Sequence, residues 1–439
     1  MTANTPSTAT VPPALHQRTV WGKTAAQAPA LASLAGDARA DVAIVGAGFT
    51  GLTAAWHLAR RGARVVVLEA QSVAAGASGL NAGFVVPNFA KADPASVMYR
   101  LGQERGRRLL EMVSAGADRV FGTARDHAIA CDPEQVGWLH VAHSPHMRDV
   151  LATRAAAWQA LGHPIKMLDE SAARTLTGVR HCHGALLDPR GGTLHPLNYA
   201  YGLARLAAQS GAVLHEHAPV SAIEKNGIAW QLYSGKYKIL ANKVLLCTNA
   251  ADHGIAKRLN RAILPLRVYQ LATQPLPKNV VHRISPGRNP IADTRANLFT
   301  YRLDRDDRLI SGGMPILPFG AQNRMARMIT QRLQRELQLP DLPRLDCIWH
   351  GTAAMTTDFL PHLYEFGPGF MAGIGCNGRG IALTAMLGEV LADAASGKAW
   401  DALPIPKASA KAIPLRPLAE AAPSLAIAQA RWRDWREGL

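Results

Sequence analysis

The residues with the clearest chemical potential are three closely spaced glycines in the run Gly46-Ala47-Gly48-Phe49-Thr50-Gly51. This is the pattern G-x-G-x-x-G. Its first glycine permits a tight turn, its second lets backbone approach a pyrophosphate, and its third allows close helix packing. Unpaired N–H groups and the positive end of the helix dipole would then bind the phosphates. Glu69 follows eighteen residues after Gly51, where a carboxylate can accept hydrogen bonds from ribose hydroxyls. Together these residues predict a dinucleotide site.

That chemistry requires a strand before the glycines and a helix after them. Residues 41–45 form a short run that is apolar after Asp41 and predict a buried strand, residues 49–61 carry apolar positions at helical spacing, and Gly62 ends this helix. Residues 65–68 predict a second strand, so the segment is a βαβ unit with two parallel strands. The uncharged stretch 42–59 has the length of a membrane span, but its glycines and His57 favour the turn motif.

A second match to the glycine pattern lies at residues 373–378, between an expected strand at 370–372 and an expected helix at 380–395. No strand ending in an acidic residue follows about twenty positions later, so this match does not predict a second dinucleotide site. We interpret it as a glycine turn whose helix N-terminus faces an electron-rich part of a cofactor bound elsewhere. Such a positive end would stabilise negative charge there.

The remaining segments predict a chain of two domains with extensions. A helix from Pro196, a strand near 213–217, a hairpin at 228–239 and a strand at 243–247 continue the α/β texture, whereas 267–314 contains interrupted strands and 322–337 a basic helix. We expect four parts in all. They are an arm at 1–39, a discontinuous nucleotide-binding domain at 40–90, 150–262 and 345–400, a substrate domain at 91–149 and 263–344, and a tail at 401–439.

Bulk properties narrow the class of protein. The 439 residues, 48% hydrophobic and 18% charged, indicate a globular enzyme that can bury a large cofactor. Five scattered cysteines without a C-x-x-C pair predict neither a metal site nor a disulfide framework, and no secretory signal is apparent, so we expect a cytoplasmic location. The net charge of +16 is spread along the chain without a nucleic-acid module. It favours a solvated basic surface over nucleic-acid binding or stable membrane insertion.

Residues 76–83, Gly-Ala-Ser-Gly-Leu-Asn-Ala-Gly, resemble the flavin-contacting loop of the D-amino-acid oxidase superfamily. The resemblance extends to residues 191–220, 243–250, 349–351, 357–358 and 373–389, and it includes Trp21 in the arm. It covers nearly the whole chain and is closest to the γ-glutamylputrescine oxidoreductase branch. The implied fold is α/β, with a FAD-binding Rossmann-like domain and a substrate domain in which a mixed β-sheet and helices roof the flavin.

The resemblance implies which residues contact FAD. Carried over position by position, together with the glycine motif, the expected cofactor-binding residues are Gly46, Gly48, Phe49, Thr50, Gly51, Glu69, Ala70, Ser78, Asn81, Ala82, Gly83, Val220, Thr248, Asn249, Gly375, Gly378, Arg379, Gly380 and Ile381. In some sarcosine-oxidising relatives a cysteine attaches the flavin, and Gly351 fills that place here. We therefore expect non-covalent FAD.

Two departures from the family bear on the substrate. Relatives that oxidise amino acids carry an arginine two residues after the glycine equivalent to Gly351, and it clamps the substrate carboxylate; here that residue is Ala353. A bidentate clamp needs a guanidinium fork, so a simple α-amino acid loses its usual anchor. The activating lysine of the sarcosine group is replaced by Ile310 in the same alignment.

Four residues are candidates for catalysis. His350 is the titratable group expected near the flavin and could accept a proton from a substrate ammonium, although a structural role is the commoner one for such a histidine. Tyr301 and Arg302 lie in a segment similar to the family's roof strand. Arg302 could pair with a distal substrate carboxylate or form a surface ion pair with a nearby aspartate. Arg379 could lie near the flavin or reach the substrate.

The implied activity is oxidation of a C–N bond in an amine or amino acid. Hydride passes from carbon to flavin N5, and the imine is hydrolysed to a carbonyl and an amine; oxygen or another acceptor then reoxidises the flavin. Two alternatives stay open. One is a flavoprotein domain acting on tRNA, motivated by the net charge. The other is a membrane-peripheral dehydrogenase of the D-amino-acid type, motivated by the Trp- and Arg-containing helix expected at 428–435, for which packing against its own protein is the commoner role.

Overall fold

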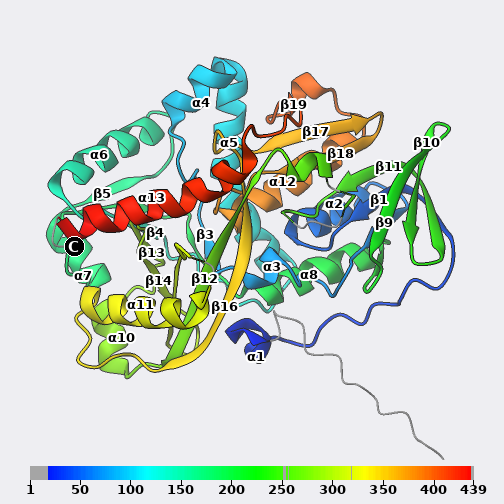
Figure 1. The fold of residues 1–439 in the computed structure, drawn as a ribbon. Coiled ribbons are helices and arrows are strands. Elements are labelled where there is room, and N and C mark those ends of the chain that lie inside the picture. The colour runs from blue at the N-terminus through cyan, green and yellow to red at the C-terminus, as the bar shows by residue number, and fades with distance from the viewer. Residues whose placement is uncertain (1–17, 251–253, 256, 318, 437–439) are drawn as a thin grey trace, which may run out of the picture.

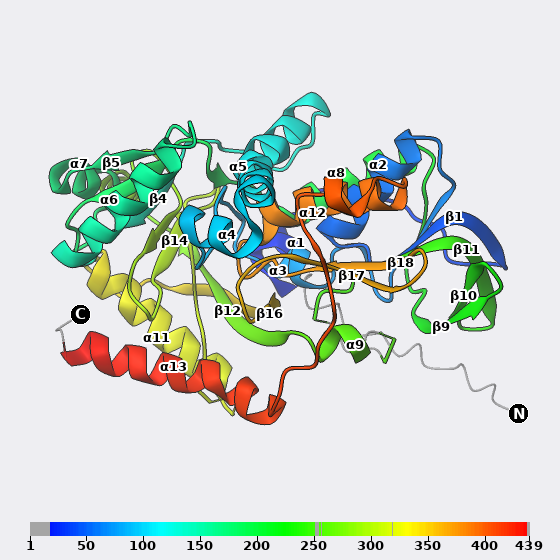
Figure 2. The ribbon, with the colours of Figure 1, turned by 90° about the horizontal axis from the view of Figure 1, so that it is seen from above.

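The computed structural model describes residues 18–250, 254–255, 257–317 and 319–436, and it contains two large sheets side by side (Figure 1). Seen from above, the glycine-turn sheet and its helices lie on one side of the molecule and the second sheet on the other (Figure 2). A small sheet pairs β3 (Phe84–Val85) with β7 (Gly192–Thr193). This arrangement confirms the expected fold class.

The glycine-turn sheet has nine strands, of which five neighbours are parallel in the order β18-β11-β1-β2-β8. Antiparallel β17 and then β19 extend one edge, and the hairpin partners β9 and β10 pair beside β11. The strands are β1 (Ala38–Val45), β2 (Val65–Leu68), β8 (Val213–His215), β9 (Val220–Asn226), β10 (Ala229–Ser234), β11 (Tyr237–Leu246), β17 (His362–Gly367), β18 (Phe370–Ile374) and β19 (Lys407–Ala408).

Both faces of the central parallel strands are buried, which explains their continuous apolar runs. Along β1, Val42 and Ile44 face one hydrophobic core and Ala43 and Val45 face another, as the period of two requires. Helices cover the first face: α2 (Phe49–Arg60), α5 (Gln103–Asp126), α8 (Pro196–Gln209) and α12 (Gly380–Ala395). Residues 42–59 therefore form the second half of β1, the glycine turn and nearly all of α2. In the part of the chain that the structure describes, no helix has both the length and the apolar character needed to cross a membrane.

The second sheet has eight strands in the order β16-β12-β15-β14-β13-β4-β6-β5, and it is mixed because β4 and β13 are parallel. Its own core is separate from those of the first sheet. The strands are β4 (Trp138–Val141), β5 (Lys166–Leu168), β6 (Ala185–Asp188), β12 (Leu264–Pro275), β13 (Ile291–Asp293), β14 (Thr300–Leu303), β15 (Arg308–Gly313) and β16 (Leu345–Met355). The other helices are α3 (Ala77–Leu80), α4 (Pro94–Leu101), α6 (Pro145–Gln159), α7 (Glu170–Thr177), α9 (Lys257–Asn260), α10 (Lys278–Ile284) and α11 (Ala321–Glu336).

The sheet membership of three strands differs from the expected domain boundaries. Strands β5, β6 and β16 lie in the second sheet, although their residues fall within the ranges 150–262 and 345–400 that we expected in the nucleotide-binding domain. The reason is pairing between distant segments, since β16 runs antiparallel to β12 along almost its whole length. We propose that the substrate domain includes these strands.

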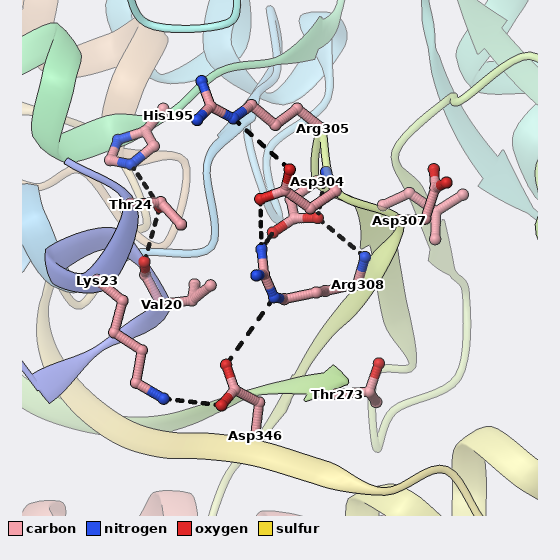
Figure 3. Close-up of polar contacts among 12 residues, drawn as sticks. Val20, Lys23, Thr24, His195, Thr273, Asp304, Arg305, Asp307, Arg308 and Asp346 are labelled. Atoms are coloured by element: carbon pink, nitrogen blue, oxygen red, sulfur yellow. Dashed lines mark hydrogen bonds and ion pairs between the residues drawn. The ribbon is translucent and has the colours of Figure 1, made fainter. Parts of the chain in front are cut away.

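The N-terminal arm is more ordered than expected. Thr19 caps a short helix, α1 (Val20–Thr24). In this helix Trp21 is buried, where it donates to the Asn81 oxygen and packs near Trp349. Lys23 forms an ion pair with Asp346 of β16 at 2.7 Å, and Thr24 lies 3.1 Å from the ring of His195 (Figure 3). The same network joins Asp346 to Arg308 on β15, so α1 fastens the edge of the second sheet.

The C-terminal tail also forms a longer helix than expected, α13 (Arg416–Arg436), after a 3-10 turn (Trp400–Ala402). It crosses the second-sheet side of the molecule near α11 (Figures 1 and 2). Ile427 and Ala430 are buried, and Arg431 Nη2 donates to the Met314 carbonyl oxygen at 2.8 Å. The Trp- and Arg-containing helix therefore packs against its own protein, while Trp432 is exposed.

Candidate active site

The carboxyl ends of four parallel strands meet at one edge of the first sheet. Gly46 follows β1, Glu69 follows β2, Cys247 follows β11 and Gly375 follows β18. Ligands of open α/β sheets bind outside such carboxyl ends. The topology thus brings both glycine turns, which are more than 300 residues apart in the chain, to one place.

The first turn has the geometry that its glycines predict. Gly46 has a φ of +104°, and a Cβ there would lie 2.7 Å from the Cys247 carbonyl oxygen. A Cβ on Gly51 would overlap the Gly46 carbonyl and approach Ile44 Cγ2 to 3.3 Å, so this glycine lets α2 pack against β1. Gly48 faces the cavity, and a Cβ there would lie 2.9 Å from Ser78 Oγ.

Glu69 is fixed beside the same turn. Its Oε2 atom accepts a hydrogen bond from the Ala47 N–H at 2.8 Å, and Oε1 accepts one from the Gln71 N–H at 2.9 Å. A carboxylate has lone pairs for more than one donor on each oxygen, so both atoms can still accept from hydroxyls. The position and the remaining acceptor capacity fit a ribose at this wall.

The loop at 76–83 closes over the start of α2 and is held from several sides. Ser78 Oγ accepts the Phe49 N–H at 3.0 Å, which satisfies one of the unpaired amides at the helix N-terminus. Two indoles donate to the loop backbone: Trp21 Nε1 to the Asn81 oxygen at 2.7 Å, and Trp349 Nε1 to the Leu80 oxygen at 2.9 Å. These contacts explain why the arm residue Trp21 belongs to the site.

A cavity of about 930 Å³ runs along this edge and continues between the two sheets. Ligand cavities span roughly 300–1,000 Å³, so this one is large enough for an extended ligand. Thr248 Oγ1 lines it as a buried polar atom without a hydrogen-bond partner among the described residues. Together with the glycine cradle and Glu69, this free hydroxyl fits a dinucleotide with polar groups along its length.

Most of the expected cofactor-binding residues line this one cavity. Gly51 and Gly83 do not: Gly51 packs against β1, and Gly83 presents its carbonyl oxygen to Arg302. The residues that do line it are Gly46, Gly48, Phe49, Thr50, Glu69, Ala70, Ser78, Asn81, Ala82, Val220, Thr248, Asn249, Gly375, Gly378, Arg379, Gly380 and Ile381.

His350 is placed away from the cavity. It lies on β16, where its neighbours Gly351 and Ala353 line the cavity and its own ring packs on Tyr269, with ring centroids 5.3 Å apart. Burial and the nearby Arg267 lower the pKa of this histidine. Since His350 does not line the cavity and its ring packs on Tyr269, its position does not support the expectation that it accepts a substrate proton.

Tyr301 and Arg302 also lie outside the cavity lining. The Tyr301 hydroxyl donates to the carbonyl oxygens of Thr177 and Ile284 within the core of the second sheet. Arg302 points to the other face of β14 and donates to the oxygens of Gly83 at 3.0 Å and Leu194 at 2.8 Å. The buried guanidinium holds the loop that ends at Gly83, so the position of Arg302 supports a structural role rather than the expected contact with a substrate carboxylate or a surface ion pair.

Arg379 is the one catalytic candidate that lines the cavity. It is the N-cap residue of α12, directly after the second glycine turn, and its guanidinium carbon lies 4.8 Å from the ring centroid of Trp138. Residues on or near the second sheet also line the cavity. They include Lys91, His140, Met147, Arg154 and the segment 292–296. Sequence reasoning missed them, since no spacing pattern connects residues that lie on separate strands and helices.

Comparisons with known proteins agree with this geometry. A family model described as DAO, FAD dependent oxidoreductase, matches residues 41–394. The chain is 31% identical over 383 residues to a probable oxidoreductase, OrdL, of Rhizobium meliloti, covering 85% of this chain and 87% of that protein. It is 28% identical over 361 residues to γ-glutamylputrescine oxidoreductase of Escherichia coli, covering 82% of this chain and 84% of that protein.

Solved structures show the same fold. Glycine oxidase of Geobacillus kaustophilus superimposes with a TM-score of 0.70 at 20% identity, covering 82% of this chain and 96% of that chain. The family match spans both glycine turns and both sheets, and the residues that the fold gathers at the cavity fit the cofactor that defines the family. The chain therefore belongs to the DAO family of FAD-dependent oxidoreductases.

Proposed function

We propose that this chain oxidises the C–N bond of an amine that it does not recognise through an α-carboxylate, with a γ-glutamylputrescine-like amine favoured. The observation that carries the proposal is Ala353 at the cavity wall, in the position where amino-acid-oxidising relatives have a clamping arginine. A methyl group there cannot bind a carboxylate. The relative named γ-glutamylputrescine oxidoreductase supports the choice of substrate class.

FAD, when bound, supplies the two-electron acceptor that takes a hydride from the carbon next to the substrate nitrogen. The chain's own residues orient the substrate and exclude water. Lys91, Arg154 and Arg379 place positive charge in the cavity wall. The amine is oxidised as the neutral species, whose lone pair assists hydride loss, so the chain need not supply a dedicated base. The absence of His350 from the cavity lining agrees with this.

The experiment is anaerobic mixing of the purified holoenzyme with a panel of amines while the flavin absorbance is followed. γ-Glutamylputrescine and related amines should bleach the flavin band, whereas glycine, sarcosine, D-amino acids and taurine should leave it unchanged; dithionite gives the fully reduced reference. Bleaching by glycine-like acids alone would contradict the role given to Ala353. Protein that carries no flavin and acquires none from added FAD would overturn the whole proposal. Non-covalent binding is checked in the same preparation, because acid precipitation should release all of the FAD.

A further inference from the structure

Two buried polar atoms in the cavity wall have no hydrogen-bond partner among the described residues. Arg379 Nε and His140 Nδ1 are both buried and lack hydrogen-bond partners among the described residues, and both side chains belong to the cavity wall. The ring of Trp138 connects them, lying 5.0 Å from the His140 ring and 4.8 Å from the Arg379 guanidinium carbon. Buried polar atoms are normally paired, so two unpaired ones in one wall indicate a ligand.

The charge in this part of the wall is unbalanced. Burial lowers the pKa of Arg379 to about 10, with a further contribution from Arg154, and no described carboxylate raises it. Burial also lowers the pKa of His140 to about 3, followed by the effects of Arg379, Arg154 and, to a smaller extent, Lys91. Three cations therefore act on one small region. Of these, Arg154 has a partner, Asp93, at 2.7 Å.

A fully buried arginine of the cavity wall, Arg295, provides a contrast to the half-buried Arg379. Arg295 is paired on one side with Asp293 and on the other with Glu336, whose Oε2 atom lies 2.9 Å from Nη2. Its charge is therefore balanced inside the protein. A buried charge that lacks such a partner is costly, and the cost falls when an anion binds beside it. Arg379 is held in this costly state by its stack on Trp138.

The tautomer of His140 indicates a second polar group that the ligand would carry. His140 Nε2 lies 3.1 Å from the Asp293 carbonyl oxygen, which can only accept, so Nε2 bears the hydrogen of the neutral ring. Nδ1 is then an acceptor. The wall thus offers a charged donor at Arg379 and, close to it, a neutral acceptor at His140, which matches a carboxylate with an N–H group nearby.

We infer that Arg379, supported by Trp138 and assisted by His140, binds a carboxylate of the substrate that is remote from the amine undergoing oxidation. The inference rests on the proposed function and deepens it, because it replaces the missing α-carboxylate clamp by a second anchor at the other end of the substrate. Two elements build the subsite: β4 of the second sheet supplies Trp138 and His140, and the start of α12 supplies Arg379. It is therefore complete only when both domains are packed together.

Turnover tests this with two matched series: ω-amino acids of increasing length, and n-alkylamines of the same lengths that lack the carboxylate. The holoenzyme should prefer the acid at the best length by about tenfold to a hundredfold in kcat/KM, since hydrogen bonds to charged groups carry this difference. Arg379→Gln should bring the ratio close to one, because kcat/KM should fall much further for the acids than for the alkylamines. Arg379→Lys should retain part of the preference, and Arg107→Gln, at an exposed arginine, should retain all of it.

A second readout does not depend on amine oxidation. Dicarboxylates such as glutarate have no amine, and their binding to the holoenzyme is measured by calorimetry and by the shift of the flavin spectrum. Arg379→Gln should weaken this binding about tenfold or more. If no amine is oxidised but glutarate still binds through Arg379, the proposed function fails and the subsite stands. Equal loss with acids and alkylamines, or glutarate affinity unchanged in both Arg379 variants, would overturn the inference.

Discussion

Replacement of Arg302 by methionine should destabilise the protein without impairing its chemistry. The guanidinium is only 2% exposed, and it donates three hydrogen bonds to carbonyl oxygens, at 3.0, 2.8 and 3.1 Å. Hydrogen bonds to a charged group contribute about 2 kcal/mol each, or about 6 kcal/mol together. Burial lowers the pKa of Arg302 to about 10, which corresponds to about 3 kcal/mol of unfavourable charge burial. The difference predicts a loss of about 3 kcal/mol in the free energy of unfolding.

Urea unfolding of the apoprotein measures this loss, and flavin titration measures its effect on the loop that Arg302 holds at Gly83. FAD affinity should fall, whereas kcat at saturating FAD should stay within about twofold of the parent, because no reacting group is removed. The matched control is Arg305→Met, three residues along the chain, where an exposed arginine contributes at most about 1 kcal/mol. An Arg302→Met enzyme with parental stability but without turnover would refute the structural role and restore a contact with the substrate.

Three further predictions concern the turn, the histidines and the missing clamp. Gly51→Ala should reduce flavin content at least about tenfold, because the new Cβ overlaps the Gly46 carbonyl, whereas Gly122→Ala on α5, where a Cβ meets open space, should not; equal content in both would contradict this packing. Burial lowers the pKa of His140 and of His195 to about 3. Between about pH 6.5 and pH 3 these histidines are protonated in the unfolded chain but not in the folded one. The free energy of unfolding should therefore fall by about 1.4 kcal/mol per pH unit for each histidine as the pH drops through this range. Unfolding at pH 7 and pH 5 checks this slope, which should become shallower in His140→Gln and in His195→Gln. Ala353→Arg should raise kcat/KM for glycine about tenfold relative to amines, with Ala353→Met as the uncharged control. If kcat/KM for glycine does not rise, position 353 is not where an arginine can bind the substrate carboxylate.

Local patterns in the sequence predict the nucleotide-binding half well. The turn at residues 46–51, the strands on either side of it and the helix after it are all specified within thirty residues, and the structure has them in that order. The second turn lies at the same edge, because β18 is beside β11 in the parallel sheet, but its expected role beside the cofactor stays a prediction. Such elements depend on near neighbours in the chain, which a single sequence displays.

What could not be predicted depends on pairing over long distances and on which way a strand faces. His350 and Ala353 lie three residues apart on β16, and their opposite orientations follow from the register with β12, which the sequence does not reveal. The same holds for Tyr301 and Arg302 on β14, which face opposite sides. His140 lacks any motif, and only the packing of β4 against the start of α12 places it beside Arg379.

The shared edge of the first sheet also constrains when the chain can acquire its flavin during biosynthesis. One wall of the crevice comes from residues 45–84, and another comes from residues 373–387, which leave the ribosome much later. A nascent chain that has exposed only the first glycine turn possesses a phosphate cradle with nothing opposite it. The crevice has both walls only after residues 373–387 have packed opposite residues 45–84, so we expect tight flavin binding to require both segments.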